Sequence, residues 1–149
     1  MNLDEMTIDV QQSTVVNGGI DEVFKGLLFR LGEGNTRPDG ESLQLNIEPW
    51  AGGRWFRDRG EGVQHLWGHV QAIKAPELLE MSGPMFMSYP AINHIEAKLE
   101  KVDDGTKITL RHRAVGMIEQ AHREGVSQGW QHMIDAVKTD FEKKSASPA

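Results

Sequence analysis

Hydrophobic residues near the C-terminal end of the chain recur at intervals of three and four. They form one apolar stripe at helical spacing: Val126, Trp130, Met133, Val137 and Phe141. The opposite side of the same segment is charged or polar, as water-facing positions require. The pattern predicts a helix from residue 119 to about 143, roughly 37 Å long at about 1.5 Å per residue.

Two glycines interrupt this helical pattern, Gly125 and Gly129. Each costs about 1 kcal/mol relative to alanine in a helix interior. Their spacing of four places them on one side of the helix, next to a tryptophan. We therefore expect another segment to pack very close to that side.

Most of the remaining chain alternates with a period of two, which is typical of strands. Strands are predicted near residues 7–16, 43–49, 54–57, 63–73 and 78–82 and on both sides of Asp104-Gly105. A shorter helix is predicted after the first strand, with Ile20, Val23, Phe24, Leu27 and Leu31 at helical spacing. Residues 83–90, GPMFMSYP, are predicted to form an apolar loop. We expect the last residues, about 144–149, to be a disordered tail.

The last predicted hairpin has the most constrained pairing. Asp104-Gly105 is a strong two-residue turn signal between alternating runs. With these residues as the turn, Ala97 lies opposite His112 and Ile95 lies opposite Ala114. A shift of one residue would mix the apolar and polar faces, so we predict this register. His112 then points to the apolar face that the long helix covers.

The order strand, helix, six strands, long helix predicts an α+β fold. We expect one curved antiparallel sheet of about seven strands with its helices on one side. A sheet that curls around a long helix tends to leave a cavity between the two. No internal repeat or linker divides residues 1–149, which we interpret as one domain.

Composition excludes several classes of function. The 149 residues carry 22 acidic and 16 basic side chains, for a formal net charge of −6, which disfavours nucleic acid as a partner. Cysteine is absent, which excludes disulfides and thiolate chemistry and favours a cytoplasmic location. No segment is long and apolar enough to predict a membrane span, and no signal peptide is visible.

Several local strings resemble the SRPBCC superfamily, which is also described as START-like or helix-grip. They are IDEVFKGLL, EPWAGGRWF, WGHVQAIKAPELLE, DDGTKITLRHRA and EGVSQGWQHMIDAV, which together cover residues from about 14 to 141. Within this superfamily the chain is most similar to the group named after activators of the heat-shock-protein ATPase. The resemblance implies an internal cavity between sheet and C-terminal helix. It also implies ligands such as lipids, hormones or polyketides, and leaves a homodimer or a co-chaperone-like interaction module open.

His112 is the strongest candidate for chemistry because the predicted register buries its imidazole. It is either a polar anchor or acid/base group inside the cavity, or a core histidine bonded to backbone or water.

Histidines in the fourth predicted strand invite a metal hypothesis. Alternation puts His65, Trp67 and His69 on one face of this strand. Strand positions four apart are separated by about 13 Å, which is too far for one ion to bind both histidines. Glu119 and His122 have the spacing of a di-metal motif but occur once, at a helix start, so we interpret them as a solvated terminus. We therefore expect no metal and no cofactor.

The sequence favours binding of a small, largely apolar ligand between sheet and C-terminal helix. The candidate ligand-binding residues are Trp67, His69, Met81, Phe86, Tyr89, His112, Trp130 and Met133. The motifs of nucleophilic catalysis and phosphate binding are absent, so no catalytic residue is assigned. The alternative is a cyclase, dehydratase or hydrolase that uses His112 as its acid/base group.

Overall fold

In residues 2–146, which the computed structural model describes, seven strands form one antiparallel sheet in the order β1-β7-β6-β5-β4-β3-β2. The strands are β1 (Thr7–Val16), β2 (Leu45–Ile47), β3 (Arg54–Asp58), β4 (Gln64–Lys74), β5 (Leu78–Gly83), β6 (Ala91–Val102) and β7 (Gly105–Gly116). The helices are a 3₁₀ turn η1 (Leu3–Met6), α1 (Ile20–Leu31) and α2 (Gln120–Ala146). The predicted fold class and element order are confirmed.

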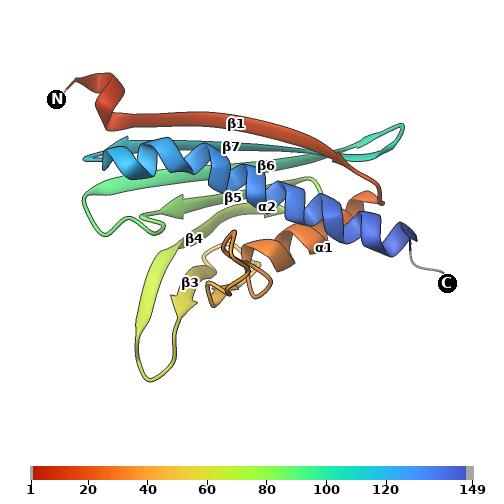
Figure 1. Cartoon of the computed structure of the whole chain (residues 1–149), viewed down its shortest axis with the longest axis horizontal. Helices are drawn as coiled ribbons and strands as arrows, with labels where there is room; N and C mark the ends of the chain where they lie inside the picture. Colours follow the sequence, from red (N-terminus) through yellow and green to blue (C-terminus); the bar gives the residue numbers. More distant parts are fainter. Residues whose placement is uncertain (1, 147–149) are drawn as a thin grey trace.

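The long helix α2 lies across the concave side of the sheet, beside β1, and its C-terminal half crosses α1 (Figure 1). The five residues of the predicted apolar stripe are all buried, with Val137 fully inaccessible and Phe141 8% exposed. The helix continues through Ala146, so residues 144–146 are helical rather than part of the predicted tail. Residues 147–149 lie outside the described part of the chain.

The β6–β7 hairpin turns one residue earlier than predicted. Val102 pairs with Gly105, so Asp103 and Asp104 form the turn. Ile95 therefore lies opposite His112, whereas the predicted partner was Ala97. The predicted register is wrong by two residues, but a shift of two leaves every side chain on its predicted face.

Glycine geometry explains where this turn falls. Gly105 has a φ of +139°, and a Cβ there would meet the carbonyl oxygen of Val16 at 2.2 Å. The end of β1 therefore requires glycine at the first residue of β7. An Asp-Gly turn of the usual hairpin type would require a positive φ at Asp104 as well, and Asp104 has none.

Strand β4 carries two β-bulges, which add curvature to the sheet. Trp55 pairs with Gly68 and Phe56 pairs with Leu66, so Trp67 is the extra residue of the first bulge. The second bulge lies between Val70 and Ala72. As Figure 1 shows, β3 and the adjoining part of β4 bend away from the long strands β1, β7 and β6.

Candidate functional site

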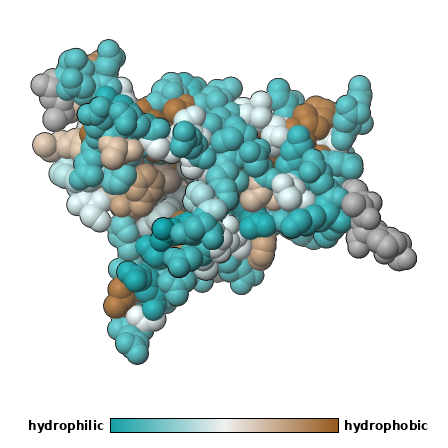
Figure 2. All heavy atoms as spheres, in the orientation of Figure 1, coloured by the Kyte–Doolittle hydropathy of each residue, from teal (hydrophilic) through white to brown (hydrophobic). Residues whose placement is uncertain are grey.

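A hollow of about 330 Å³ lies between α2, the loop that joins α1 to β2, and the bulged strands β3 and β4. Figure 2, in the same orientation as Figure 1, shows tan and pale side chains at a recess below α2, on a mostly hydrophilic face. The hollow lies on the side of α2 that faces away from β1, and apolar side chains form most of its lining.

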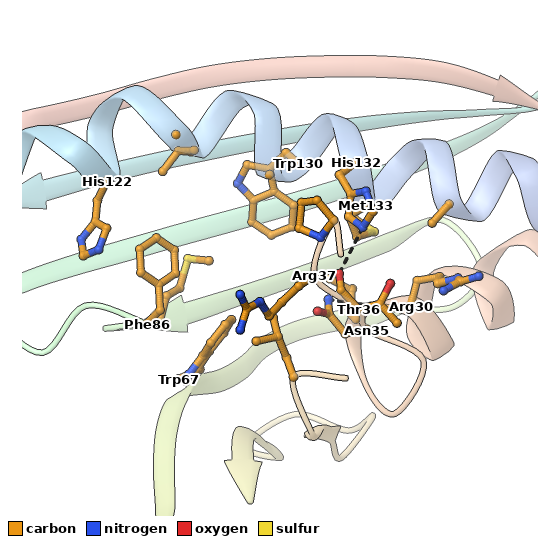
Figure 3. A pocket seen from close by; sticks show the side chains of 18 of the residues that line it. Arg30, Asn35, Thr36, Arg37, Trp67, Phe86, His122, Trp130, His132 and Met133 are labelled. Atoms are coloured by element: carbon orange, nitrogen blue, oxygen red, sulfur yellow. Dashed lines mark hydrogen bonds between the residues drawn. The ribbon is translucent and has the colours of Figure 1, made fainter. Parts of the chain in front are cut away.

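Aromatic rings form a continuous row along the inner wall of the hollow. Trp55 and Trp67 meet edge to face at 5.2 Å between ring centroids, and Trp67 meets Phe86 at 5.9 Å. Phe86 in turn meets the imidazole of His122 on α2 at 4.8 Å. Figure 3 shows Trp67, Phe86 and His122 along one end of the pocket and Trp130 above it. Each edge-to-face contact adds about 0.5–1.5 kcal/mol beyond burial, so the row is a preformed wall.

Backbone contacts bring Phe86 to this wall. Gly68 and Gly83 face each other on β4 and β5, and a Cβ on Gly83 would come within 2.4 Å of the Gly68 Cα. This close approach lets the Met85 N–H donate to the Trp67 carbonyl oxygen at 2.7 Å. Met85 has a φ of 55°, an uncommon left-handed conformation, and its side chain is buried in the wall.

The loop between α1 and β2 forms the opposite wall. Thr36 and Ser42 form an isolated β-bridge, and the Arg37 N–H donates to the Glu41 carbonyl oxygen at 2.8 Å. The loop is tied to α2 by His132, whose Nε2–H donates to the Thr36 carbonyl oxygen at 3.1 Å (Figure 3). These contacts hold the polar loop residues at the mouth of the hollow.

One end of the hollow is closed by an ion pair between the two helices. Arg30 on α1 donates to both carboxylate oxygens of Asp140 on α2, at 2.7 and 2.6 Å. Its remaining terminal nitrogen donates to the Gly34 carbonyl oxygen at 3.0 Å. Hydrogen bonding to Asp140 raises the pKa of Arg30 above its ordinary value. Arg30 thus fixes the crossing of α1 and α2.

His122 occupies the other end. Its Nδ1 lies 2.7 Å from the Tyr89 hydroxyl oxygen, and the two rings stack with centroids 5.6 Å apart. Burial raises the pKa of Tyr89 above its ordinary value, so this hydroxyl stays protonated at neutral pH. Nε2 of His122 has no hydrogen-bond partner among the described side chains, and the residue lines the hollow.

His112 lies in the sheet beneath α2 and is fully buried, as the sequence predicts. Its Nδ1 accepts the Trp130 indole N–H at 2.9 Å, so Nε2 carries the proton and donates to the Asn93 amide oxygen at 2.6 Å. The Asn93 amide nitrogen donates to the Gly83 and Pro84 carbonyl oxygens, both at 3.1 Å. Both ring nitrogens therefore have protein partners, and burial lowers the pKa of His112 to about 4.

Four of the eight predicted ligand-binding residues line the hollow: Trp67, Phe86, Trp130 and Met133. Met81 and His112 are buried in the core on the sheet side and do not reach it. Tyr89 lies one layer out, where it holds His122. His69 is exposed on the other side of the sheet.

The placement of His69 corrects the prediction that it shares a face with Trp67. The bulge inserts Trp67 as an extra residue, so both Trp67 and Gly68 point inward. Alternation then resumes with Val70 inward and His69 outward. The predicted face of β4 is therefore correct up to Trp67 and wrong from Gly68 to Val70, because simple alternation cannot foresee a bulge.

The two glycines of α2 also correct a prediction. Nothing lies within 4 Å of a Cβ built at Gly125 or at Gly129, so no segment packs against them. Both line the hollow, together with Ala121 and Ala136 on the same side of the helix. Small residues at these positions leave space open.

The structure adds lining residues that sequence reasoning missed. They are Arg30, Leu31, Asn35, Thr36, Arg37, Pro38, Leu43, Trp55, Ala121, His122, Gly125, Val126, Gly129, His132 and Ala136. The spacing of Gly125 and Gly129 was the sequence signal for the small residues that α2 presents to the hollow. It was interpreted as a sign of close packing instead. No sequence pattern placed the loop after α1 against α2.

Metal ligation finds no support in residues 2–146, where no three histidine, aspartate or glutamate side chains are grouped to hold an ion. Within the same range, no helix is both long and apolar enough to span a membrane.

A curved antiparallel sheet wrapped around a C-terminal helix, with a hollow beside that helix, defines the helix-grip class of the SRPBCC superfamily. More particularly, the chain belongs to the family described as "Activator of Hsp90 ATPase homolog 1-like protein", whose model matches residues 40–142. None of the curated proteins compared with the chain matches it in sequence.

Solved structures share the fold at low sequence identity. An uncharacterised protein from Rhizobium leguminosarum is similar with a TM-score of 0.70 and 15% identity, over 92% of this chain and 95% of that one. A protein of unknown function from Staphylococcus aureus gives 0.67 and 13%, over 98% and 100%. The di-domain ARO/CYC protein StfQ of the steffimycin biosynthetic pathway gives 0.66 and 12%, over 97% of this chain and 54% of that one. At these identities the likeness shows the fold alone.

Proposed function

We propose that the protein binds one small, largely apolar molecule in the hollow beside α2. The observation that carries this proposal is the bare side of the helix at Gly125 and Gly129. Two glycines cost helix stability, and neither is needed for close packing, because nothing lies within 4 Å of a Cβ at either position. Open space beside an aromatic wall is the arrangement expected of a ligand pocket.

The size and lining of the hollow agree with this function. Its volume of about 330 Å³ is at the lower end of the range of about 300–1,000 Å³ typical of small-molecule sites. Rings of Trp55, Trp67, Phe86 and Trp130 offer apolar contact, and Met85 and Met133 supply adaptable thioethers. StfQ, which shares the fold, is an ARO/CYC protein of the steffimycin biosynthetic pathway, which supports aromatic molecules as the compounds to test first.

Binding is tested with N-phenyl-1-naphthylamine, an uncharged dye whose fluorescence rises in apolar surroundings. We expect saturable binding to the wild-type protein and a loss of at least tenfold in affinity in Gly129→Leu, whose side chain would occupy the hollow. Gln128→Leu is the matched control, because Gln128 is an exposed neighbour on α2 that does not line the hollow. Equal affinity in all three proteins would overturn the proposal.

Thermal stability provides a second measurement. A ligand present at one hundred times its dissociation constant should raise the free energy of unfolding by about 2.7 kcal/mol. A library of aromatic, lipid and polyketide-like compounds can be screened for such an increase in Tm. Compounds that raise the Tm of the wild type, but not that of Gly129→Leu, bind in the hollow.

An enzyme of the cyclase or dehydratase kind is the second candidate, and His122 is the observation that favours it. Its Nε2 is unpartnered among the described residues at the hollow, and Tyr89 orients the ring through Nδ1. A general acid or base needs such a nitrogen, whereas both nitrogens of His112 are occupied. Turnover of a bound compound that is lost in His122→Gln, with dye binding retained, would identify the protein as an enzyme.

A further inference from the structure

The acid/base side chains that line the hollow are all basic types. Arg30, Arg37, His122 and His132 line it, and no aspartate or glutamate does so within the described residues. The chain as a whole carries 22 acidic residues against 16 basic ones. A lining without a carboxylate on such an acidic protein favours a neutral or anionic ligand over a cationic one.

Two of these four side chains already have protein partners at their donors. Arg30 donates to both oxygens of Asp140, and His132 donates to Thr36. His122 contacts the Tyr89 hydroxyl through Nδ1 and keeps Nε2 unpartnered among the described residues. Of the two arginines, which are the lining residues with a permanent positive charge, Arg37 has the less committed guanidinium.

The guanidinium of Arg37 makes two loose ionic contacts with its own loop. One terminal nitrogen lies 3.1 Å from Asp39, and the other lies 3.4 Å from Glu41. All three side chains are at least half exposed, so each pair is worth at most about 1 kcal/mol and is screened by salt. Its Nε–H has no hydrogen-bond partner among the described residues. An incoming anion can therefore share this guanidinium or displace the loop carboxylates from it.

The backbone around Arg37 is held in place. Its N–H donates to the Glu41 carbonyl oxygen, and its own carbonyl oxygen accepts the Gly40 N–H, both at 2.8 Å. The neighbouring Thr36 is fixed to α2 by His132. In Figure 3 the Arg37 guanidinium extends from the loop toward the side of the pocket where Phe86 and Trp67 lie. The Arg37 guanidinium, with its two exposed loop carboxylates, thus stands at the mouth of an apolar, aromatic-walled hollow.

We propose that the ligand is an organic acid, with an apolar body against the aromatic wall and one acidic group bound by Arg37. This rests on the proposed function, since it names the chemical class of the molecule in the same hollow. An arginine fork binds carboxylate or sulfonate through two parallel N–H···O bonds, which would orient the molecule with its acidic end at the mouth.

Two dyes with the same ring system test this inference. 1-Anilinonaphthalene-8-sulfonate is N-phenyl-1-naphthylamine with an added sulfonate, so their affinities differ through the charge. We expect the sulfonate dye to bind about fivefold more tightly than the neutral dye at low salt. We expect this advantage to disappear in Arg37→Gln and to persist in Arg59→Gln, a control in the distant β3–β4 loop.

Removal of a competing carboxylate provides the opposite change. Glu41→Gln takes away one partner of the Arg37 guanidinium while the backbone contacts of the loop remain. The sulfonate dye should then bind more tightly, while affinity for the neutral dye stays the same. Raising the salt concentration should lower the affinity for the sulfonate dye but not the affinity for the neutral dye.

The apolar part of the natural acid could be an aromatic ring or an aliphatic chain. Displacement of the neutral dye by competing compounds distinguishes these two cases. 2-Naphthoate is compared with 2-naphthamide, and decanoate is compared with decanamide. A preference for the acid within either pair supports the inference, and the pair that displaces more strongly identifies the body.

The two proposals fail in distinguishable ways. If the neutral dye binds in the hollow but the sulfonate dye binds no tighter, or binds as tightly to Arg37→Gln, the organic-acid inference is wrong and ligand binding stands. If the affinity of neither dye changes in Gly129→Leu, both proposals are wrong.

Discussion

His112 is a buried polar residue whose hydrogen bonds are complete within the protein. The chain from Trp130 through His112 and Asn93 to the Gly83 and Pro84 carbonyl oxygens links α2, β7, β6 and the end of β5. Every donor and acceptor in it is matched only while the imidazole is neutral with its proton on Nε2. The residue therefore acts as a structural pin between the long helix and the sheet.

Protonation of His112 should weaken the fold. Burial lowers its pKa in the folded protein from 6.5 to about 4, so between these values the unfolded chain binds a proton that the folded protein does not. Its contribution to stability is complete above pH 6.5 and is lost as pH falls toward 4, by about 2 kcal/mol at pH 5. Urea titrations at pH 7, 6 and 5 measure the free energy of unfolding that checks this prediction.

His112→Gln removes this titration and provides the comparison. The variant should be less stable at pH 7, and its difference from the wild type should shrink as the pH falls. A wild-type-to-His112→Gln difference that stays constant from pH 7 to pH 5 would contradict the assigned burial effect.

Residue-level reasoning from sequence succeeded where a local rule was sufficient. The burial of His112 followed from alternation along β7. Local rules could not show that the Trp130 indole is the partner of His112, because the two residues lie on separate elements. The role of His112 as a ligand anchor was open for the same reason.

The helix α2 has two working sides. One side is buried, with Ile134, Val137 and Phe141, where α2 contacts β1 and α1. The other side presents the small residues Ala121, Gly125, Gly129 and Ala136 to the hollow, and Val126, Trp130 and Met133 lie between the two sides. The hydrophobic spacing predicted the buried stripe correctly, whereas the small residues carry almost no hydrophobic signal.

Alanine at the two pocket glycines should stabilise the protein. A Cβ at Gly125 or Gly129 meets nothing within 4 Å, and alanine is about 1 kcal/mol better than glycine in a helix interior. We expect each substitution to raise the free energy of unfolding by about 0.5–1 kcal/mol in urea titrations. A loss of stability in either variant would show that a segment does pack there.

Phe141 is an apolar contact between the two helices, beside the Arg30–Asp140 ion pair. A Cβ at Gly18 would lie 2.6 Å from its ring and a Cβ at Gly26 would lie 2.8 Å from it, so both glycines make room for the ring. We expect Phe141→Ala to cost about 3–5 kcal/mol of unfolding free energy, and Phe141→Leu to cost less.

A double-mutant cycle tests this contact directly. Gly26→Ala should destabilise the wild type, because its methyl group collides with the ring. In the Phe141→Ala background the same change should stabilise the protein, because the space is free and alanine favours the helix. Additive effects of the two substitutions would contradict the packing of Phe141 against Gly26.

The sheet shows which element-level features sequence can supply. Strand positions followed from alternation and turn residues, and the number of strands was predicted correctly. The β6–β7 register and the inner face of β4 were not. Contact of Gly105 with the end of β1 set the register, and the Trp67 bulge set the face. Both effects come from neighbouring strands, which no local pattern records.

The largest gap between sequence and structure lies at the scale of the whole molecule. A cavity between sheet and long helix was predicted, and a hollow does lie beside α2. Its outer wall is the loop after α1, which in the sequence is a polar run of turn-forming residues. Only the fold brings residues 35–43 against residues 121–136 of α2. Arg37 and His132 were therefore beyond reach from the sequence.

The contact between His132 and Thr36 should control how tightly this loop is held. His132→Leu removes the side-chain donor to the Thr36 carbonyl oxygen, the hydrogen bond that joins the loop to α2 in Figure 3. We expect faster amide hydrogen exchange across residues 33–43, with exchange in β6 and β7 unchanged. Unchanged loop exchange would mean that the bridge from Thr36 to Ser42 is sufficient to hold it.

The bare flank of α2 also bears on how relatives of this fold could diverge. Changes at positions 125 and 129 alter the room available to a guest without disturbing any neighbour and without loss to the scaffold. Single substitutions at these two positions, one helical turn apart, could thus change which ligand the protein prefers. Such an arrangement permits the fold to stay the same while ligand specificity changes.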